Sequence, residues 1–139
     1  MELAGSSLVA TGISSGIGAA GGRLLVQKGA SVVGGHAPAE ETNGGFVLCD
    51  LGELDSLDAC LSRLPDRVDG LANTAGLPGT SDPVTIGRVN FLGLRHLTEA
   101  IHTRMNAGGS VAHFAGRREL ISGAAVAQLR KDRRTLGDT

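Results

Sequence analysis

The feature that most constrains the fold is a glycine-rich turn between a short apolar segment and a helical pattern. Residues Ser7–Ala10 read as a buried strand, and the turn Thr11–Gly18 (Thr-Gly-Ile-Ser-Ser-Gly-Ile-Gly) follows directly. Apolar residues at helical spacing then run from Ile17 to Lys28, and Gly29 ends the pattern. A phosphate at a helix N-terminus requires free backbone N–H groups and no obstructing side chain. The turn is therefore predicted to hold a phosphate group.

The rest of the chain alternates between short apolar segments and helical patterns. Asp82 and Pro83 suit the N-cap and first turn of a long helix, and Gly108-Gly109 is expected to end it. Gly35–Gly45 is too polar and broken for a helix and is expected to be a loop or a single turn. The alternation predicts an α/β fold with a parallel sheet covered on both faces. The further strands are expected at 31–34, 46–49, 70–73 and 110–114, and the further helices at 53–63, 84–106 and 118–134.

Length and composition favour one globular domain over residues 1–139. Apolar residues make up 41% of the chain and the formal net charge is −1. The cations are scattered apart from a short run at 130–134, so no nucleic-acid partner is expected. The start lacks a basic segment and the apolar runs are short, so we expect no signal peptide, no membrane span and a cytoplasmic location.

Cysteine and histidine spacing does not predict a metal site. Cys49 and Cys60 lie outside any CxxC pattern and are expected to be reduced core residues. His96 and Glu99 share a helix face, but His102 lies away from it. We therefore predict no bound metal.

Four motifs, in order, resemble the short-chain dehydrogenase/reductase family over about residues 6–116. Thr11-Gly12-x-x-x-Gly16-Ile17-Gly18 resembles its cofactor fingerprint, and Asp50-Leu51 resembles the segment that the family sets against adenine. Asn73-Thr74-Ala75-Gly76 is similar to its Asn-Asn-Ala-Gly, and Asn90 matches the asparagine of its catalytic tetrad. The resemblance implies a three-layer Rossmann-like parallel sheet of about five strands in the order 3-2-1-4-5, without the family's last strands.

The resemblance also implies that the chain binds NAD or NADP. Some of the matched residues have a plainer interpretation: Asp50 as a helix cap, Asn73 as a turn residue and His36 as a surface loop residue. His36 stands where an acidic residue would favour NAD and an arginine NADP, so the two cofactors are not distinguished. The implied cofactor-binding residues are Gly12, Ser14, Ser15, Gly16, Ile17, Gly18, His36, Asp50, Leu51, Asn73, Ala75 and Gly76.

The catalytic residues of the family are largely missing from this chain. Its chemistry uses a Ser, a Tyr and a Lys beside the Asn; this chain has no Tyr, and the Ser position falls on Gly116. Asn90 is the retained catalytic candidate, although a structural role in mid-helix is also open. His113 is a candidate substitute acid or base, with a hydrogen-bonded strand residue as the alternative.

Two functions follow from the resemblance. One is an oxidoreductase-like NAD(P)-binding protein, acting on an alcohol or ketone in the family and weakly active or inactive here. The other is a non-catalytic binding or oligomerisation module, or a fragment of a longer dehydrogenase. Apolar residues on the long helix and small residues in the last helix favour a homo-oligomer through helix 84–106 and the last helix. The fifth strand is expected to be an uncovered edge.

Overall fold

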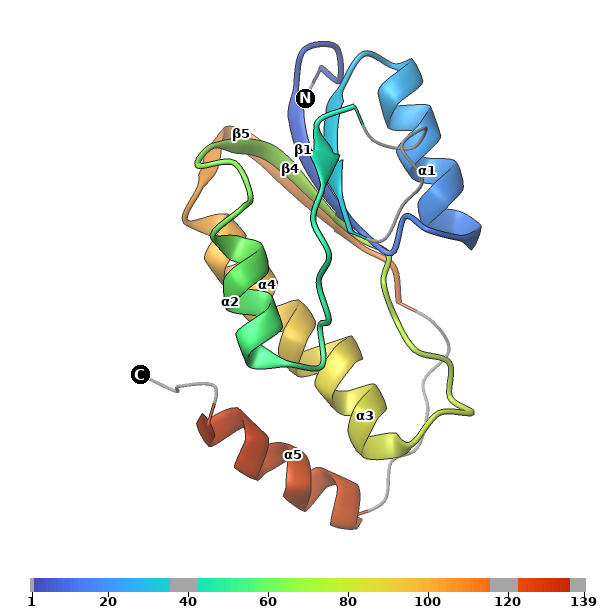
Figure 1. Cartoon of the computed structure of the whole chain (residues 1–139), viewed down its shortest axis with the longest axis vertical. Helices are drawn as coiled ribbons and strands as arrows, with labels where there is room; N and C mark the ends of the chain where they lie inside the picture. The colour runs from blue at the N-terminus through green and yellow to red at the C-terminus, as the bar shows by residue number, and fades with distance from the viewer. Residues whose placement is uncertain (1, 36–42, 116–122, 136–139) are drawn as a thin grey trace.

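The computed structural model describes residues 2–35, 43–115 and 123–135 (Figure 1). The chain alternates strands and helices, as the sequence predicts. In chain order the elements are β1 (Ser7–Thr11), α1 (Gly16–Gln27), β2 (Ser31–Gly34), β3 (Gly45–Phe46), α2 (Leu54–Leu61), β4 (Val68–Asn73), α3 (Pro83–Gly87), the π-helix η2 (Arg88–Gly93), α4 (Leu94–His102), β5 (Met105–His113) and α5 (Gly123–Thr135).

The strands form one parallel five-stranded sheet in the order β3-β2-β1-β4-β5. The predicted α/β class and strand order are therefore confirmed. β1 lies at the centre, where Val9 pairs with Val33 of β2 on one side and with Leu71 of β4 on the other. This arrangement brings the carboxyl ends of β1 and β4 side by side, which is where α/β sheets bind ligands.

Each face of the sheet has its own apolar core, because side chains alternate along a strand. Leu8 and Val32 face α1 and pack in a small cluster with Ile13. Val9 and Leu71 face the other way and pack in a larger cluster that includes residues of α2 and α4. Figure 1 shows α1 on one side of the sheet and α2 and α4 on the other.

The prediction of a long helix over 84–106 is wrong at the carboxyl end of that helix. The helical region begins at Pro83, as predicted, but α4 ends at His102. The amide of Val68 donates to the carbonyl of Arg104 at 3.1 Å, so the chain joins the sheet beside β4 from that point. Gly108, at φ +81°, lies inside β5, where the pairing with β4 is irregular. The glycine pair thus forms a bulge within the strand and does not end the helix.

Other predicted segments also have different bounds. β4 begins at Val68 and not at 70, β5 spans Met105–His113 and not 110–114, and α2 spans Leu54–Leu61 and not 53–63. The strand expected over 46–49 is only Gly45–Phe46, after which the chain continues in extended form without ladder pairing. The last helix, expected over 118–134, is described from Gly123 to Thr135. Residues 36–42, most of the expected loop, and residues 116–122, which include the start of that helix, lie outside the described residues.

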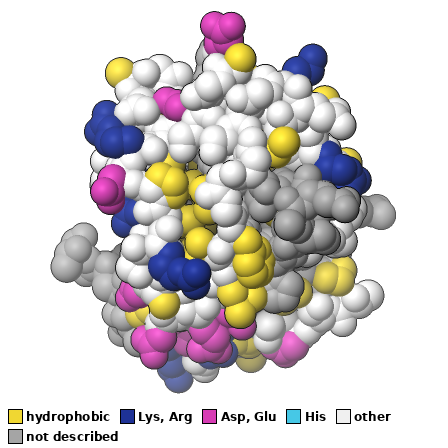
Figure 2. All heavy atoms as spheres, turned by 45° about the horizontal axis from the view of Figure 1, so that its top comes forward, with side chains coloured by type: hydrophobic (Ala, Val, Ile, Leu, Met, Phe, Trp, Pro, Cys, Tyr) yellow, Lys and Arg dark blue, Asp and Glu magenta, His cyan; other side chains and the backbone are white. Residues whose placement is uncertain are grey.

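β5 is the edge of the sheet in the described part of the chain. It pairs with β4, and most of its residues are exposed, which agrees with the uncovered edge expected from the sequence. α5 packs elsewhere, against α3 and η2, where Arg88 Nε meets Asp132 Oδ2 at 2.7 Å. Figure 2 shows hydrophobic side chains exposed in the middle of one face of the molecule. Among the described residues, no helix has the length and apolar character needed to cross a membrane.

Candidate functional site

A groove of about 690 Å³ lies at the carboxyl ends of the strands. Three segments form it: the turn after β1, the extended chain after β3 and the loop after β4. Most of the residues expected to bind a cofactor line this groove: Gly12, Ser14, Ser15, Ile17, Gly18, Asp50, Leu51, Ala75 and Gly76. The fold therefore brings together motifs that are far apart in the sequence.

Two glycines of the turn are required by packing within the protein. A Cβ on Gly12 would lie 2.5 Å from the amide nitrogen of Ala75, and one on Gly18 would lie 2.1 Å from the carbonyl oxygen of Gly12. The loop after β4 is bonded to the same turn, because Thr74 Oγ1 donates to the carbonyl of Thr11 and the Ala75 amide donates to Thr11 Oγ1. These contacts fix the turn against the loop and leave no space for larger residues.

Gly16 is required by backbone conformation. Its φ is +54°, and no atom lies within 4 Å of the position that a Cβ would take. Ser15, the N-cap residue of α1, makes no side-chain capping bond, and the first turn of α1 has no acidic residue. Ser14, Ser15 and Ile17 are exposed, with Ile17 at 69%. The start of α1 therefore presents N–H groups and two hydroxyls beside the groove, an arrangement that favours an anion.

Asp50 contributes a carboxylate to the opposite wall of the groove. One oxygen, Oδ1, accepts a 2.8 Å hydrogen bond from the Gly52 amide, and the Asp50 amide donates to Ser56 Oγ at 2.8 Å. Glu53, not Asp50, is the N-cap residue of α2. The cap interpretation of Asp50 is thus wrong in detail: the residue orders the turn before the helix. Its side chain is exposed, so it is accessible to a ligand in the groove.

Asn90 joins the π-helix η2 to the loop after β4. Its Oδ1 accepts from the Leu77 amide at 2.7 Å, and its Nδ2 donates to the Leu77 carbonyl at 2.9 Å. Gly93, at the end of η2, lets the carbonyl oxygen of Leu51 approach to 1.8 Å from the position that a Cβ would occupy. The π-helix η2 therefore contacts two walls of the groove, the loop at Leu77 and the extended chain at Leu51. These two bonds give Asn90 a structural contact with the loop, and its assignment as a catalytic residue stays a prediction.

Asn73 and His113 form a polar pair behind the groove. Thr98 Oγ1 donates to the Leu94 carbonyl at 2.6 Å, so it accepts the 3.1 Å bond from Asn73 Nδ2. The same Asn73 nitrogen lies 3.2 Å from His113 Nδ1, which must then accept. A neutral His113 carries its proton on Nε2. The ring is thus a hydrogen-bond donor at Nε2, and its Nδ1 is already occupied.

The structure also shows what the motif interpretation missed or misplaced. Asn73 is fully buried and does not line the groove, and its Oδ1 has no hydrogen-bond partner among the described residues. His36 lies outside the described residues. Groove residues that the sequence analysis did not assign to cofactor binding are Leu48, Cys49, Ser56, Thr74, Leu77 and Val89. Four of them adjoin recognised motif residues, which is the only sequence signal they carry.

Comparison with known proteins gives consistent relatives. Coniferyl-alcohol dehydrogenase of Pseudomonas sp. (strain HR199 / DSM 7063) is 44% identical over 116 residues, which cover 83% of this chain and 46% of that protein. The 3-oxoacyl-(acyl-carrier-protein) reductase FabG of Vibrio harveyi is 35% identical over 89 residues, 55% of this chain and 36% of that protein. The chain thus spans less than half the length of these two curated relatives. No protein-family model matches it.

Solved structures share the fold. A protein described as a short chain dehydrogenase/reductase family protein superposes with a TM-score of 0.69 at 28% identity. The match covers 98% of this chain and 67% of that one. The five-stranded sheet and its helices therefore correspond to a large part of a known α/β fold.

Proposed function

The chain belongs to the short-chain dehydrogenase/reductase family, and from that premise we propose that it binds NAD or NADP in the groove at the carboxyl ends of its strands. The observation that carries this proposal is the meeting of three elements around one groove. They are the start of α1, the Asp50 carboxylate and the loop at Ala75–Gly76. The start of α1 is suited to bind phosphates, and the Asp50 carboxylate can accept hydrogen bonds from an amino group or from hydroxyls.

The residues of the turn fit such a ligand. Ser14, Ser15 and the first amides of α1 would hold the pyrophosphate, because they are exposed and the helix start carries no competing acid. Asp50 would accept a hydrogen bond from the adenine end with the carboxylate oxygen that the Gly52 amide does not use. When bound, the dinucleotide would supply a nicotinamide ring that can give or accept a hydride.

We propose that this chain is weakly active or inactive in hydride transfer. The sequence has no Tyr to serve as the family's acid and base. His113 is a poor replacement as a base, because its Nδ1 faces the Asn73 amide and its Nε2 carries the proton. It is better suited to donate a hydrogen bond to a carbonyl oxygen. Loss of a general acid or base typically lowers a rate by about 10²–10⁴-fold.

A substrate class follows from the relatives. One is named for an alcohol and another for the reduction of a 3-oxoacyl group, so an alcohol or carbonyl compound is the proposed substrate. A non-catalytic dinucleotide-binding module is the second candidate, and the missing Tyr favours it.

A cytoplasmic location and self-association through the α3–α4 region and α5 are also proposals. Three of the apolar residues on the predicted long helix, Leu92, Leu97 and Ile101, are buried in the chain's own structure. An interface there would depend on Phe91, which is 57% exposed. Sedimentation of the wild type and Phe91→Ser tests this, and a monomeric wild type would contradict it.

The binding proposal is tested by titrating NADH and NADPH into the purified chain while following cofactor fluorescence. The protein has no Trp, so excitation of the protein does not obscure the signal. Asp50→Ala should weaken binding by about tenfold, the equivalent of about 1.4 kcal/mol for a charged hydrogen bond. Asp55→Ala is the matched control, because Asp55 lies in the first turn of α2 and does not line the groove. An unchanged signal at millimolar cofactor would contradict the proposal.

Turnover is measured separately. A panel of alcohols and ketones is incubated with the cofactor that binds, and the absorbance of the reduced form is followed. Binding without turnover favours the non-catalytic module. Turnover that His113→Ala leaves unchanged would exclude His113 from the reaction.

A further inference from the structure

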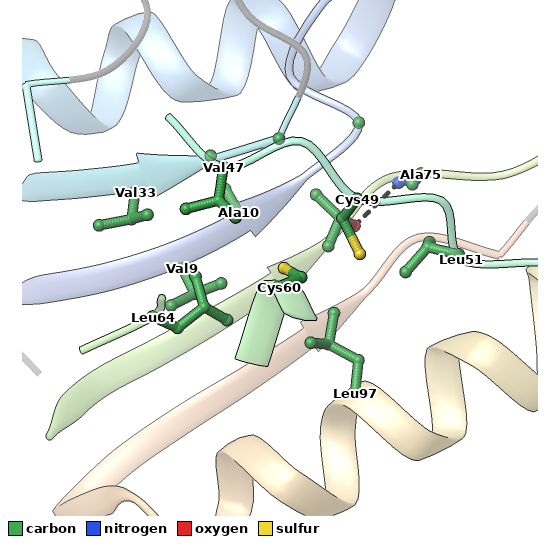
Figure 3. A pocket seen from close by; sticks show the side chains of 14 residues that line it. Val9, Ala10, Val33, Val47, Cys49, Leu51, Cys60, Leu64, Ala75 and Leu97 are labelled. Carbon is green, nitrogen blue, oxygen red and sulfur yellow. Dashed lines mark hydrogen bonds between the residues drawn. The ribbon is translucent and has the colours of Figure 1, made fainter. Parts of the chain in front are cut away.

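A second, smaller cavity lies beside the groove and contains both cysteines (Figure 3). We call it the dithiol pocket: a space of about 130 Å³ lined by Cys49, Cys60 and apolar residues such as Val9, Val47, Leu64 and Leu97. Figure 3 shows the two sulfur atoms on the same side of the pocket, Cys49 on the extended chain after β3 and Cys60 on α2. Two segments that are separate in the fold thus bring their thiols together.

The two thiols are neighbours in the dithiol pocket. Cys49 and Cys60 lie close enough for each thiol to shift the pKa of the other, and both are free cysteines. Cys60 is buried, with 5% of its surface exposed, whereas Cys49 is partly exposed. Because Cys49 also lines the groove, it stands where the dithiol pocket meets the groove. A small solute in the groove therefore meets Cys49 first.

The surroundings of the pair shift the pKa values of the two thiols in opposite directions. Interaction with the Cys49 thiol lowers the pKa of Cys60; burial opposes this shift and the nearby Arg63 guanidinium assists it. Interaction with the Cys60 thiol, burial and the Asp50 carboxylate raise the pKa of Cys49. Cys60 is therefore the thiol of the pair that more readily becomes a thiolate. A thiolate is the reactive form of cysteine.

From this geometry we propose that Cys49 and Cys60 form an oxidisable dithiol site that a small hydroperoxide converts to an intramolecular disulfide. The pocket volume exceeds the roughly 30 Å³ that a water molecule occupies in the liquid, so hydrogen peroxide can enter. The apolar lining excludes larger charged oxidants. The disulfide would join the chain after β3, which forms one wall of the groove, to α2.

The reaction balances with hydrogen peroxide as the two-electron oxidant. The thiolate sulfur of Cys60 attacks one peroxide oxygen, the O–O bond breaks, and the departing hydroxide takes a proton to become water. The sulfur now carries a hydroxyl group. The sulfur of Cys49 then attacks the oxidised sulfur of Cys60, so that an S–S bond forms and the S–O bond breaks. The second hydroxide leaves as water after taking the remaining thiol proton. Two thiols and one peroxide thus give one disulfide and two waters.

The test exposes the folded, reduced full chain to excess hydrogen peroxide, then unfolds it and alkylates the remaining thiols. Cleavage after Glu53 places the two cysteines in separate peptides, so a cross-linked pair is read directly by mass spectrometry. We expect loss of both alkylatable thiols, a mass lower by two hydrogens and full recovery with dithiothreitol. The same treatment of the urea-unfolded chain should give less of this cross-link, because the fold no longer holds the sulfurs together.

Cys49→Ala and Cys60→Ala are the matched variants, each with one remaining thiol. Neither can form the intramolecular bond, so each should give sulfenic and higher acids or dimers between chains. The wild-type result does not depend on how well these variants fold. Two alkylatable thiols after excess peroxide, or separate sulfinic acids on each cysteine, would overturn the proposal.

Discussion

Two glycines in the first helix provide a direct test of why the glycine-rich turn has its sequence. Gly18 and Gly21 both lie inside α1, so replacement by alanine brings the same gain in helix propensity, about 1 kcal/mol. Their surroundings differ. A Cβ on Gly21 meets nothing within 4 Å, whereas one on Gly18 would lie 2.1 Å from the Gly12 carbonyl oxygen. Comparison of the two variants isolates the steric effect of that contact.

The expected magnitudes follow from these contacts. Gly21→Ala should stabilise the protein by about 1 kcal/mol, the propensity gain alone. Gly18→Ala meets a backbone oxygen, which cannot rotate away, and also Thr74 Oγ1 at 2.5 Å. Overpacking of this kind costs about 3 kcal/mol at the upper end of the usual range, which leaves a net loss of about 2 kcal/mol. The two variants should then differ by about 3 kcal/mol, or roughly 10 °C in Tm.

The assay is thermal and urea unfolding followed by circular dichroism, with wild type and both variants in the same buffer. NADH titration of the same samples adds a second measurement. Gly21→Ala should bind as the wild type does, and Gly18→Ala should bind more weakly because the turn shifts from the loop at Thr74–Ala75. Equal stability of the two alanine variants would refute the packing explanation of Gly18. If the two variants also bound NADH equally well, the turn would not be part of the proposed site.

Two further perturbations test other parts of the structure. Asn90→Ala removes two hydrogen bonds to the Leu77 backbone, so the free energy of unfolding should fall by about 1–2 kcal/mol and NADH binding should weaken. The control Gln27→Ala, at an exposed amide side chain in the last turn of α1, should change neither. An unaltered urea midpoint for Asn90→Ala would contradict the role of this bond pair. The Asp69 carboxylate accepts hydrogen bonds from the Asn106 side chain and the Ser7 amide, and these bonds lower its pKa. Its contribution to stability is therefore present above the unfolded pKa of about 3.9 and is lost as the pH falls through the lower folded pKa. Asp69→Asn should flatten this acid-side decline of Tm, and an identical pH profile in the variant would exclude Asp69 as a cause.

The parts of the fold that the sequence predicted are those in which local pattern and tertiary structure agree. β1, β2 and the start of the helical region at Pro83 follow from apolar runs and from the Asp82 cap, whose carboxylate accepts from the Thr85 amide at 2.9 Å. The end of α4 was mispredicted because residues 103–107 have no strong stop signal. Their pairing with β4, beginning at Val68 opposite Met105, decides the boundary.

Other features of the site have no local signal at all. The π-helix η2 depends on Gly93, where the carbonyl of Leu51 approaches from a distant segment, and helical periodicity cannot reveal such a contact. The same holds for the pocket that Cys49 and Cys60 share and for the hydrogen bond between Asn73 and His113. Each joins segments that only the strand order brings together.

The glycine motif by itself carries less functional information than its resemblance to a cofactor fingerprint indicates. Gly12 and Gly18 are explained by contacts with the protein's own backbone, so a chain with no ligand would also require them. What points to a ligand is the remainder: Gly16 beside open space, a helix start with neither side-chain cap nor acid, and exposed serines next to a groove. The loop at Thr74–Ala75 is held against the turn by the same packing, and Asn90 holds the following residues. The family fingerprint thus specifies a rigid groove first. Whether that groove is used for catalysis depends on residues outside the fingerprint, and in this chain no tyrosine is among them.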